Sequence, residues 1–168
     1  PFLVAPAPNE IALDKILTAG MRVPDHGGLQ PWKFTIVKEQ GLEKLSDIFV
    51  TAATENGADE QVLAKTQKMP FRAPMIIVVS TQYQVHKVPE SEQLIAAGCC
   101  VHAMQMAAFA LGYGAMWRTG DLSYHALVKD KLSIATHDDI VGFLYLGTPG
   151  REVTIRKSKP YQAHVRYL

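Results

Sequence analysis

Hydrophobic spacing in the first quarter of the chain predicts one helix followed by one strand. Apolar residues recur at intervals of three and four along residues 10–22, which gathers them on one face of a helix. Asn9 is suited to cap the first turn of this helix, and Pro24 ends the pattern. Residues 32–38 (WKFTIVK) then alternate large apolar with polar side chains, which is typical of a half-buried strand.

The middle of the chain continues with two helices and a second strand. Apolar residues repeat at helical spacing over residues 42–52, until the Asn56-Gly57 pair ends the pattern. Residues 59–68 are a short, mostly polar helix candidate. Residues 74–80 (PMIIVVS) form an apolar run that is too short for a helix and rich in β-branched side chains. We therefore interpret that run as a fully buried central strand.

Residues 90–113 predict a long helix with an unusual surface. They form about seven turns rich in Ala, Leu, Met and Cys, with almost no charge after Glu92. A helix that is apolar on every side must be buried on every side. Because one domain of this size buries such a helix with difficulty, we expect a second copy to cover one of its faces, which predicts a homodimer. The alternative is a central helix enclosed by the chain's own sheet and helices.

The remaining elements complete a single α+β domain over residues 1–168. We expect a short strand near residues 115–118, a helix near 124–132 and a buried strand over 140–146. The tail from Thr148 is irregular and basic, and we expect it to extend over a neighbour. The chain has 168 residues, of which 48% are hydrophobic, and no internal repeat or linker. It is predicted to fold as one domain, with mixed strands around the long internal helix.

Charge and cysteine content narrow the functional class. Lys and Arg number 17 and Asp and Glu number 16, so the chain lacks the basic field that attracts nucleic acids or acidic membranes. It also has no early apolar export segment and no uninterrupted run of about eighteen apolar residues, so we expect a cytoplasmic protein. Cys99 and Cys100 are adjacent within the apolar helical run, and we interpret both as packing thiols.

The sequence lacks the motifs of a metal site, a serine hydrolase and a dinucleotide-binding fold. The six histidines form no HxxxH or HxH pair, so we expect no metal site. No serine lies in a Gly-x-Ser-x-Gly turn of the hydrolase type. The segment 112–114 (GYG) resembles the start of a dinucleotide fingerprint, but it follows a helix and enters a strand, which is the reverse of the required order. Gly112 is instead predicted to end the helix in the left-handed conformation.

Two stretches carry the candidate binding chemistry. The first, residues 19–32, is a helix end and loop that holds a cation, an imidazole, an amide and an aromatic ring: Arg22, His26, Gln30 and Trp32. This set suits a flat, anionic ligand with a polar edge. The second, residues 112–120, places Trp117 and Arg118 among glycines. Taken singly, each residue also has a structural interpretation without a ligand. Arg22 would be a cation at a helix end, His26 would bond to turn backbone, and Trp32 and Trp117 would lie in the core.

In combination and order, segments along almost the whole chain resemble the nitroreductase family of flavoproteins, most closely its small NAD(P)H nitroreductase branch. The matching segments are residues 5–8 (APAP), 19–26 (AGMRVPDH), 30–32 (QPW), 70–74 (PFRAP), 86–89 (HKVP), 103–108 (AMQMAA), 117–120 (WRTG) and 140–147 (IVGFLYLG). The resemblance implies an α+β fold and an obligate homodimer that binds FMN in two pockets at the subunit interface. This agrees with the homodimer expected from the apolar helix.

The resemblance also implies the residues of the site. Those expected to bind FMN are Arg22, His26, Gln30, Trp117, Arg118 and Thr119. Those expected to face the nicotinamide donor are Ala107, Ala108, Phe109, Ala110, Leu111 and Gly112. Family members begin with a helix and an Arg-Arg-Ser motif that grips the flavin phosphate, and this sequence starts just after the place where that motif belongs. Either the protein has that motif outside this sequence, or it has lost it; if it has lost it, we expect Arg118 or Arg166 to supply the cation for the phosphate.

The activity implied by the resemblance is FMN-dependent oxidation of NAD(P)H with reduction of nitroaromatic or quinone-like acceptors. Hydride passes through flavin N5, and donor and acceptor share one pocket in a ping-pong sequence. Arg22 is expected to stabilise the anionic reduced flavin and His26 to fix its polar rim, with no side chain assigned as proton donor. The alternative is a flavin-binding or flavin-sensing dimer without turnover. A third possibility, dehalogenation or cofactor fragmentation on the same fold, would require a lid, and the sequence has no long insertion to form one.

Overall fold

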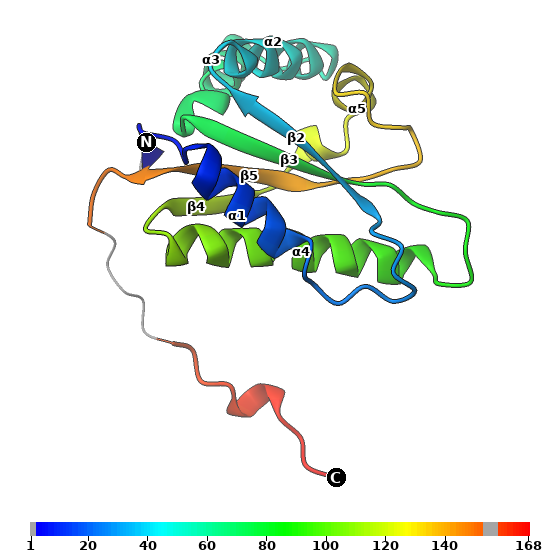
Figure 1. Cartoon of the computed structure of the whole chain (residues 1–168). Coiled ribbons are helices and arrows are strands. Elements are labelled where there is room, and N and C mark those ends of the chain that lie inside the picture. The colour runs from blue at the N-terminus through cyan, green and yellow to red at the C-terminus, as the bar shows by residue number, and fades with distance from the viewer. Residues whose placement is uncertain (1–2, 153–157) are drawn as a thin grey trace.

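The computed structural model describes residues 3–152 and 158–168, and its centre is a five-stranded sheet with helices on both faces (Figure 1). The strands are β1 (Leu3–Val4), β2 (Trp32–Lys38), β3 (Met75–Thr81), β4 (Gly114–Arg118) and β5 (Ile140–Pro149). Their order is β1-β5-β3-β2, and β4 also pairs with β5. Each of these pairings is antiparallel, where we expected a mixture of directions. The expected α+β class is confirmed.

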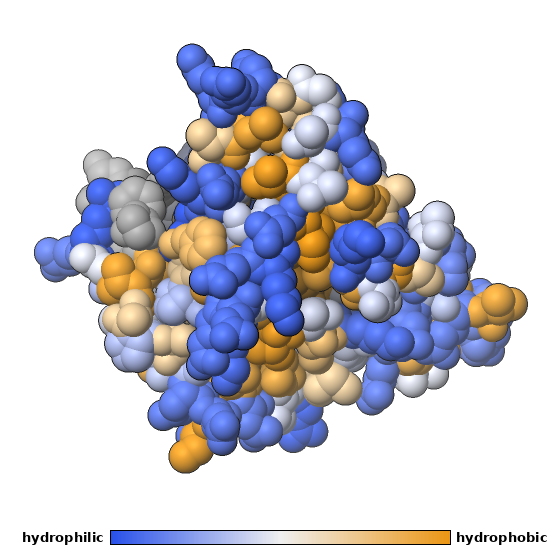
Figure 2. Space-filling model, turned by 90° about the horizontal axis from the view of Figure 1, so that it is seen from above, coloured by the Kyte–Doolittle hydropathy of each residue, from blue (hydrophilic) through white to orange (hydrophobic). Residues whose placement is uncertain are grey.

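The helices form two layers that enclose the sheet. α1 (Glu10–Gly20) and α4 (Glu90–Ala110) cover one face, and α2 (Gln40–Glu55), α3 (Glu60–Gln67) and α5 (Ala126–Lys131) lie on the other (Figure 1). Each layer has its own apolar core against the sheet. On the α2 face, hydrophilic side chains cover much of the surface, with smaller hydrophobic areas between them (Figure 2). Because both faces are covered, β3 is buried along its whole length, as its apolar sequence predicts.

Local sequence signals correctly predicted several element boundaries. The side chain of Asn9 accepts a hydrogen bond of 2.9 Å from the backbone N–H of Ala12, which is the predicted cap of α1. β2 spans the predicted residues, and Gly112 has a φ of 83° just after α4. β5 runs to Pro149, beyond the predicted end at residue 146.

The long helix α4 is packed along one side and exposed along another. One side packs against α1 and the sheet through Ala97, Cys100 and Met104. A second side faces outward, where Ile95 is 65%, Met106 51% and Phe109 46% exposed. Among the described residues, the chain's own sheet and helices therefore do not enclose α4, so the alternative is wrong. Cover of the open side by a second copy stays a prediction. α4 is long and apolar enough to cross a membrane, but core helices of other proteins share that property, and α4 packs on a sheet here.

We define the outward stripe of α4 as the exposed residues that follow one another along its uncovered side: Ile95, Cys99, His102, Met106 and Phe109. The two cysteines are divided between the two sides of the helix. Cys100 is buried, and burial raises the pKa of its thiol to about 12. Cys99 is exposed, so the interpretation of both cysteines as packing residues holds only for Cys100. Both thiols are free.

Polar side chains fix the junction between the end of β3 and the start of β5. The Thr81 hydroxyl donates to the carboxylate of Asp138 (3.2 Å) and accepts from the backbone N–H of Asp139 (2.7 Å). The backbone N–H of Tyr83 donates to Asp138 (2.7 Å), and its hydroxyl donates to Asp139 (2.8 Å). Burial, with help from Asp139, raises the pKa of Tyr83 to about 12. These hydrogen bonds thus fix the start of the segment that connects β3 to α4.

The C-terminal residues 158–168 lead away from the body of the domain (Figure 1). Their apolar and aromatic side chains, Tyr161, Val165, Tyr167 and Leu168, are exposed. The expectation that this tail extends over a neighbour stays a prediction. Part of the expected irregular tail, residues 153–157, lies outside the described residues.

The cap of α1 supplies a stability test. Replacing Asn9 with Ala removes the side-chain acceptor for the Ala12 N–H, and we expect the free energy of unfolding to fall by about 1 kcal/mol. Asn56, an exposed residue after α2 whose side chain makes no hydrogen bond among the described residues, is the matched control. Asn56→Ala should change stability by less than about 0.5 kcal/mol. Urea unfolding followed by circular dichroism measures both, and equal effects of the two substitutions would contradict the cap.

Candidate functional site

The two candidate stretches lie on opposite flanks of α4. On one flank, Gly20 at the end of α1 lies so close to Cys100 and Met104 that an added Cβ would come within 2.9 Å of each. On the other flank, the ring of Trp117 approaches Gly98. Positions 98 and 100 are roughly 200° apart around a helix. The outward stripe therefore separates the loop after α1 from the strand β4 within one chain.

The loop after α1 presents two polar side chains that are free to bind. Arg22 is exposed, and its guanidinium makes no hydrogen bond or ion pair with any residue that the structure describes. The Gln30 side chain is exposed and equally uncommitted, while its backbone, at a φ of 48°, donates to the Asp25 carboxylate at 2.6 Å. Trp32 is buried, and its indole N–H donates to the sulfur of Met21 at 3.1 Å. Trp32 is therefore a core residue rather than a ligand-binding one.

His26 is tied to the first turn of α4. Its Nδ1 lies 2.6 Å from Oε2 of Glu92, and both side chains remain substantially exposed. The two residues border a shallow hollow of about 200 Å³, whose other lining residues are Pro24, Ile95, Ala96 and Cys99. The hollow thus combines a polar edge with an apolar wall at one end of the outward stripe. Sequence reasoning missed Glu92, because the partner of a loop histidine 66 positions away has no local signal.

On the other flank, Trp117 and Arg118 point to different faces of the sheet. The Trp117 indole N–H donates to the carbonyl of Val141 at 3.1 Å, and its ring lies against Gly142, where an added Cβ would collide with it. Only the outer part of the Trp117 ring is therefore available to a ligand. Arg118 follows on the α2 face, since side chains alternate along a strand. There the charges of Arg72 and Arg118 oppose the effect of burial, which raises the pKa of Tyr145.

The predicted nicotinamide segment, residues 107–112, lies at the far end of α4 from His26. Ala108 is buried, whereas Phe109 is exposed and Gly112 has open space around its Cα. At a rise of 1.5 Å per residue, this end of α4 is about 24 Å from Glu92. A single chain therefore does not bring the three predicted groups of site residues together.

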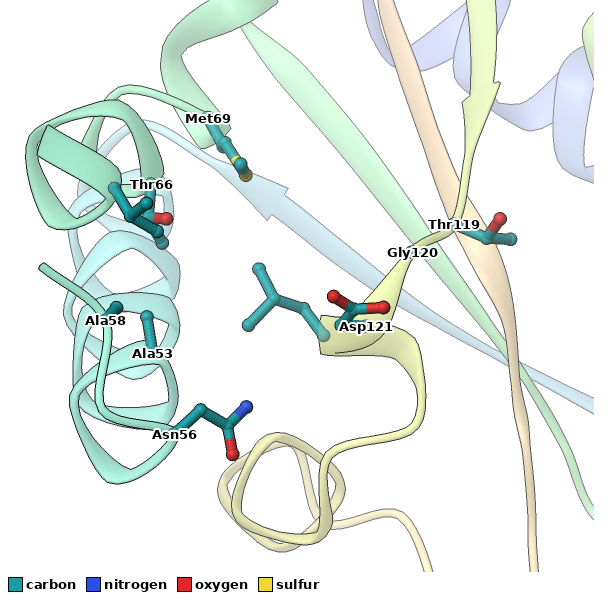
Figure 3. A pocket seen from close by; sticks show the side chains of 10 residues that line it. Ala53, Asn56, Ala58, Thr66, Met69, Thr119, Gly120 and Asp121 are labelled. Carbon is teal, nitrogen blue, oxygen red and sulfur yellow. The ribbon is translucent and has the colours of Figure 1, made fainter.

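A second hollow, of about 390 Å³, lies on the α2 face (Figure 3). It is lined by Ala53, Asn56, Ala58, Val62, Thr66, Met69, Thr119, Gly120, Asp121 and Leu122. Asn56 and Met69 extend toward it, whereas the Thr119 side chain lies on the far side of its backbone (Figure 3). This lining has one carboxylate and no Lys or Arg, so it does not suit a flavin phosphate. The buried hydroxyl of Ser123, which follows Leu122 in the chain, has no hydrogen-bond partner among the described residues.

Comparisons with known proteins agree with this fold. The family model described as "Nitroreductase family" matches residues 2–148. An Escherichia coli (strain K12) protein named "Putative NAD(P)H nitroreductase YdjA" is 47% identical over 148 residues, which are 88% of this chain and 81% of that protein.

Two solved structures share the fold at low sequence identity. A nitroreductase-like family protein from Bacillus cereus superposes with a TM-score of 0.82 at 20% identity, covering 100% of this chain and 90% of that one. A protein from Desulfovibrio desulfuricans, described as a "putative nitroreductase in complex with fmn", has a TM-score of 0.74 at 20% identity, covering 97% and 87%. The match of the family model over most of the chain, with the relative at 47% identity, shows that this chain belongs to the nitroreductase family.

Proposed function

We propose that this chain is an FMN-dependent NAD(P)H oxidoreductase that reduces nitroaromatic or quinone-like acceptors and works as a homodimer. The observation that carries the proposal is the placement of two sets of ligand-type residues on either side of an uncovered apolar stripe. Family membership and the NAD(P)H nitroreductase name of the E. coli relative support the activity. The FMN held by the D. desulfuricans protein supports the cofactor.

The uncommitted groups of the chain fit the ring system of a flavin. A flavin ring is flat, apolar over its benzenoid part and polar along its pyrimidine edge. Arg22 offers a free cation and His26 an imidazole, and Ile95 and Ala96 supply an apolar wall beside them. Trp117 offers ring surface alone, because Val141 already accepts its N–H. Arg118, directed to the α2 face, would reach a flavin at β4 through its backbone rather than its guanidinium.

A second copy across the outward stripe would complete the pocket. In a two-fold symmetric dimer each surface faces its own copy, so two α4 helices crossing near Cys99 and His102 would place opposite helix ends side by side. The loop with His26 in one chain would then lie near the end of α4 that carries residues 107–112 in the other. The same contact would cover Ile95, Met106 and Phe109, which one chain leaves exposed.

In this arrangement the residues of the chain would bind the flavin, orient its ring and shield it from water. FMN, when bound, would supply the hydride chemistry that links NAD(P)H oxidation to reduction of the acceptor. Arg22 would stabilise negative charge at the polar edge, and His26 would hold that edge in register. The apolar stripe would exclude water, and one open pocket used in turn by donor and acceptor would give ping-pong kinetics. No side chain is assigned as proton donor, and we place the protein in the cytoplasm, where NAD(P)H is supplied.

The first test is spectroscopic. The chain mixed with FMN and separated from free cofactor should be yellow, and anaerobic NADPH or NADH should bleach it. Adding a nitroaromatic or a quinone should restore the colour, and steady-state rates should give parallel lines in double-reciprocal plots. Retention of FMN without bleaching would favour the binding dimer without turnover. A chain that retains no FMN would contradict the proposal.

Arg22 supplies the second test. Arg22→Ala removes a guanidinium that makes no hydrogen bond or ion pair with a described residue, so we expect the fold to keep its stability while the FMN dissociation constant rises roughly tenfold or more. Quenching of FMN fluorescence measures the affinity. Lys15→Ala, which removes an exposed cation from α1, is the matched control and should leave the affinity unchanged. Equal affinities for the two variants would remove Arg22 from the site.

The third test addresses the proposed dimer. Ile95→Glu places a charge on the outward stripe and should convert the dimer to monomers, because a carboxylate buried in an apolar contact is strongly unfavourable. Ile11→Glu on α1 is the control, since Ile11 is 71% exposed and Ile95 65%. Light scattering after size-exclusion chromatography gives the mass of each. A wild-type monomer, or an Ile95→Glu variant that stays dimeric, would refute the interface.

A further inference from the structure

We propose that Glu92 is a positioning residue that fixes the ring of His26 so that Nε2 faces the hollow; its role in flavin binding rests on the proposed function. The contact between His26 Nδ1 and Glu92 Oε2 is 2.6 Å long. An ionised carboxylate can only accept, so Nδ1 carries the proton and donates it. In the neutral imidazole, Nε2 then holds the lone pair. The hydrogen-bond network, rather than an observed proton, assigns this tautomer.

The first turn of α4 is a rigid support for Glu92. The next residue, Gln93, is 1% exposed. Its side-chain oxygen accepts from the backbone N–H of Gln84 at 3.0 Å, and its amide donates to the carbonyls of Gln84 (3.0 Å) and Val88 (3.1 Å). The helix start and the segment of residues 82–89 are therefore joined by three hydrogen bonds. A buried amide with these bonds satisfied resists displacement, because moving it would leave polar groups unpaired.

The same segment also holds the loop that carries His26. The side-chain amide of Gln84 donates to the carbonyl of Leu29, and the backbone N–H of Gln82 donates to the carbonyl of Pro31 at 3.0 Å. Gly27, next to His26, has a φ of 85°, and an added Cβ there would press on segment 82–89 at 3.3 Å. The backbones of His26 and Glu92 are thus fixed relative to each other through a third segment, and the ion pair sets only the imidazole ring.

Orientation, rather than stability, is the effect to expect from this pair. The side chain of His26 is 66% exposed and that of Glu92 47%, and ion pairs at such exposure contribute little to folding. Both residues line the hollow next to Ile95 and Ala96. A lone pair presented there suits an N–H donor on the edge of a flat ring, such as the imide N–H of a flavin pyrimidine. Glu92 would thereby determine which edge of the ring enters the hollow.

The experiment compares Glu92→Leu and Glu92→Gln with Glu90→Gln, a control substitution in the same helical turn at an exposed residue. We expect the FMN dissociation constant to rise roughly tenfold in Glu92→Leu and by less in Glu92→Gln, whose amide oxygen can still accept from Nδ1. Glu90→Gln should match the wild type. In a His26→Ala background, Glu92→Leu should have no further effect, because the two residues act as one unit.

A second readout does not need the cofactor. Nitrogen chemical shifts of His26 in the ligand-free chain should report the Nδ1-protonated tautomer in the wild type and a mixture in Glu92→Leu. Unchanged shifts, or an equal loss of FMN affinity in the His26→Ala background, would overturn the positioning role. If the wild type binds no FMN at all, the proposed function fails, while the shift comparison still decides whether Glu92 sets the ring. Thermal unfolding of each variant confirms that the fold is retained.

Discussion

The arrangement of this molecule depends on one constraint, which is that α4 has no strongly polar face. Exposure of most of its surface to water is unfavourable, and the described part of the chain covers one side of it, through α1 and the sheet. Gly20 permits the close approach of α1, since any larger residue there would push on Cys100 and Met104. What the chain leaves uncovered is an apolar stripe that ends beside His26 and Glu92. The exposed apolar surface of α4 and the candidate binding residues therefore lie next to each other.

The sequence predicted those parts of the fold that depend on local signals. The Asn9 cap, the alternation in β2, the apolar run in β3 and Gly112 after α4 each depend on residues within one element, and the structure agrees with all of them. For α4 the sequence predicted a helix that one chain does not bury completely, but it did not predict which side stays open, because a nearly uniform apolar composition does not tell which side a neighbouring element covers. The same reason prevented a prediction of which cysteine is buried, because neighbouring positions on a helix face different sides: Cys100 is buried and Cys99 is exposed.

The site was predictable in its residue types and unpredictable in its geometry. Arg22 and His26 lie exposed on one loop, as their spacing indicated, and Arg22 is free to bind. Trp117 and Arg118, adjacent in sequence, separate to opposite sheet faces because strand side chains alternate. The roles of Glu92 and Gln93 were not predicted, because their hydrogen-bond partners lie in loops that are distant in sequence or have no regular pattern. Contacts between loops are set by the tertiary fold, which no single periodicity encodes.

The polar residues at the start of α4 explain how loops without regular structure hold a defined geometry. A loop that relies on its own backbone would lose conformational entropy at every residue it orders, and few intrinsic contacts would compensate. Here Gln93 satisfies three backbone groups of segment 82–89, and that segment in turn binds the carbonyls of Leu29 and Pro31. The cost of burying the Gln93 amide is offset by the three hydrogen bonds that its side chain makes. Helix α4 therefore presents an apolar surface along its length and a polar anchor at its first turn, and the anchor positions the loop at the edge of that surface.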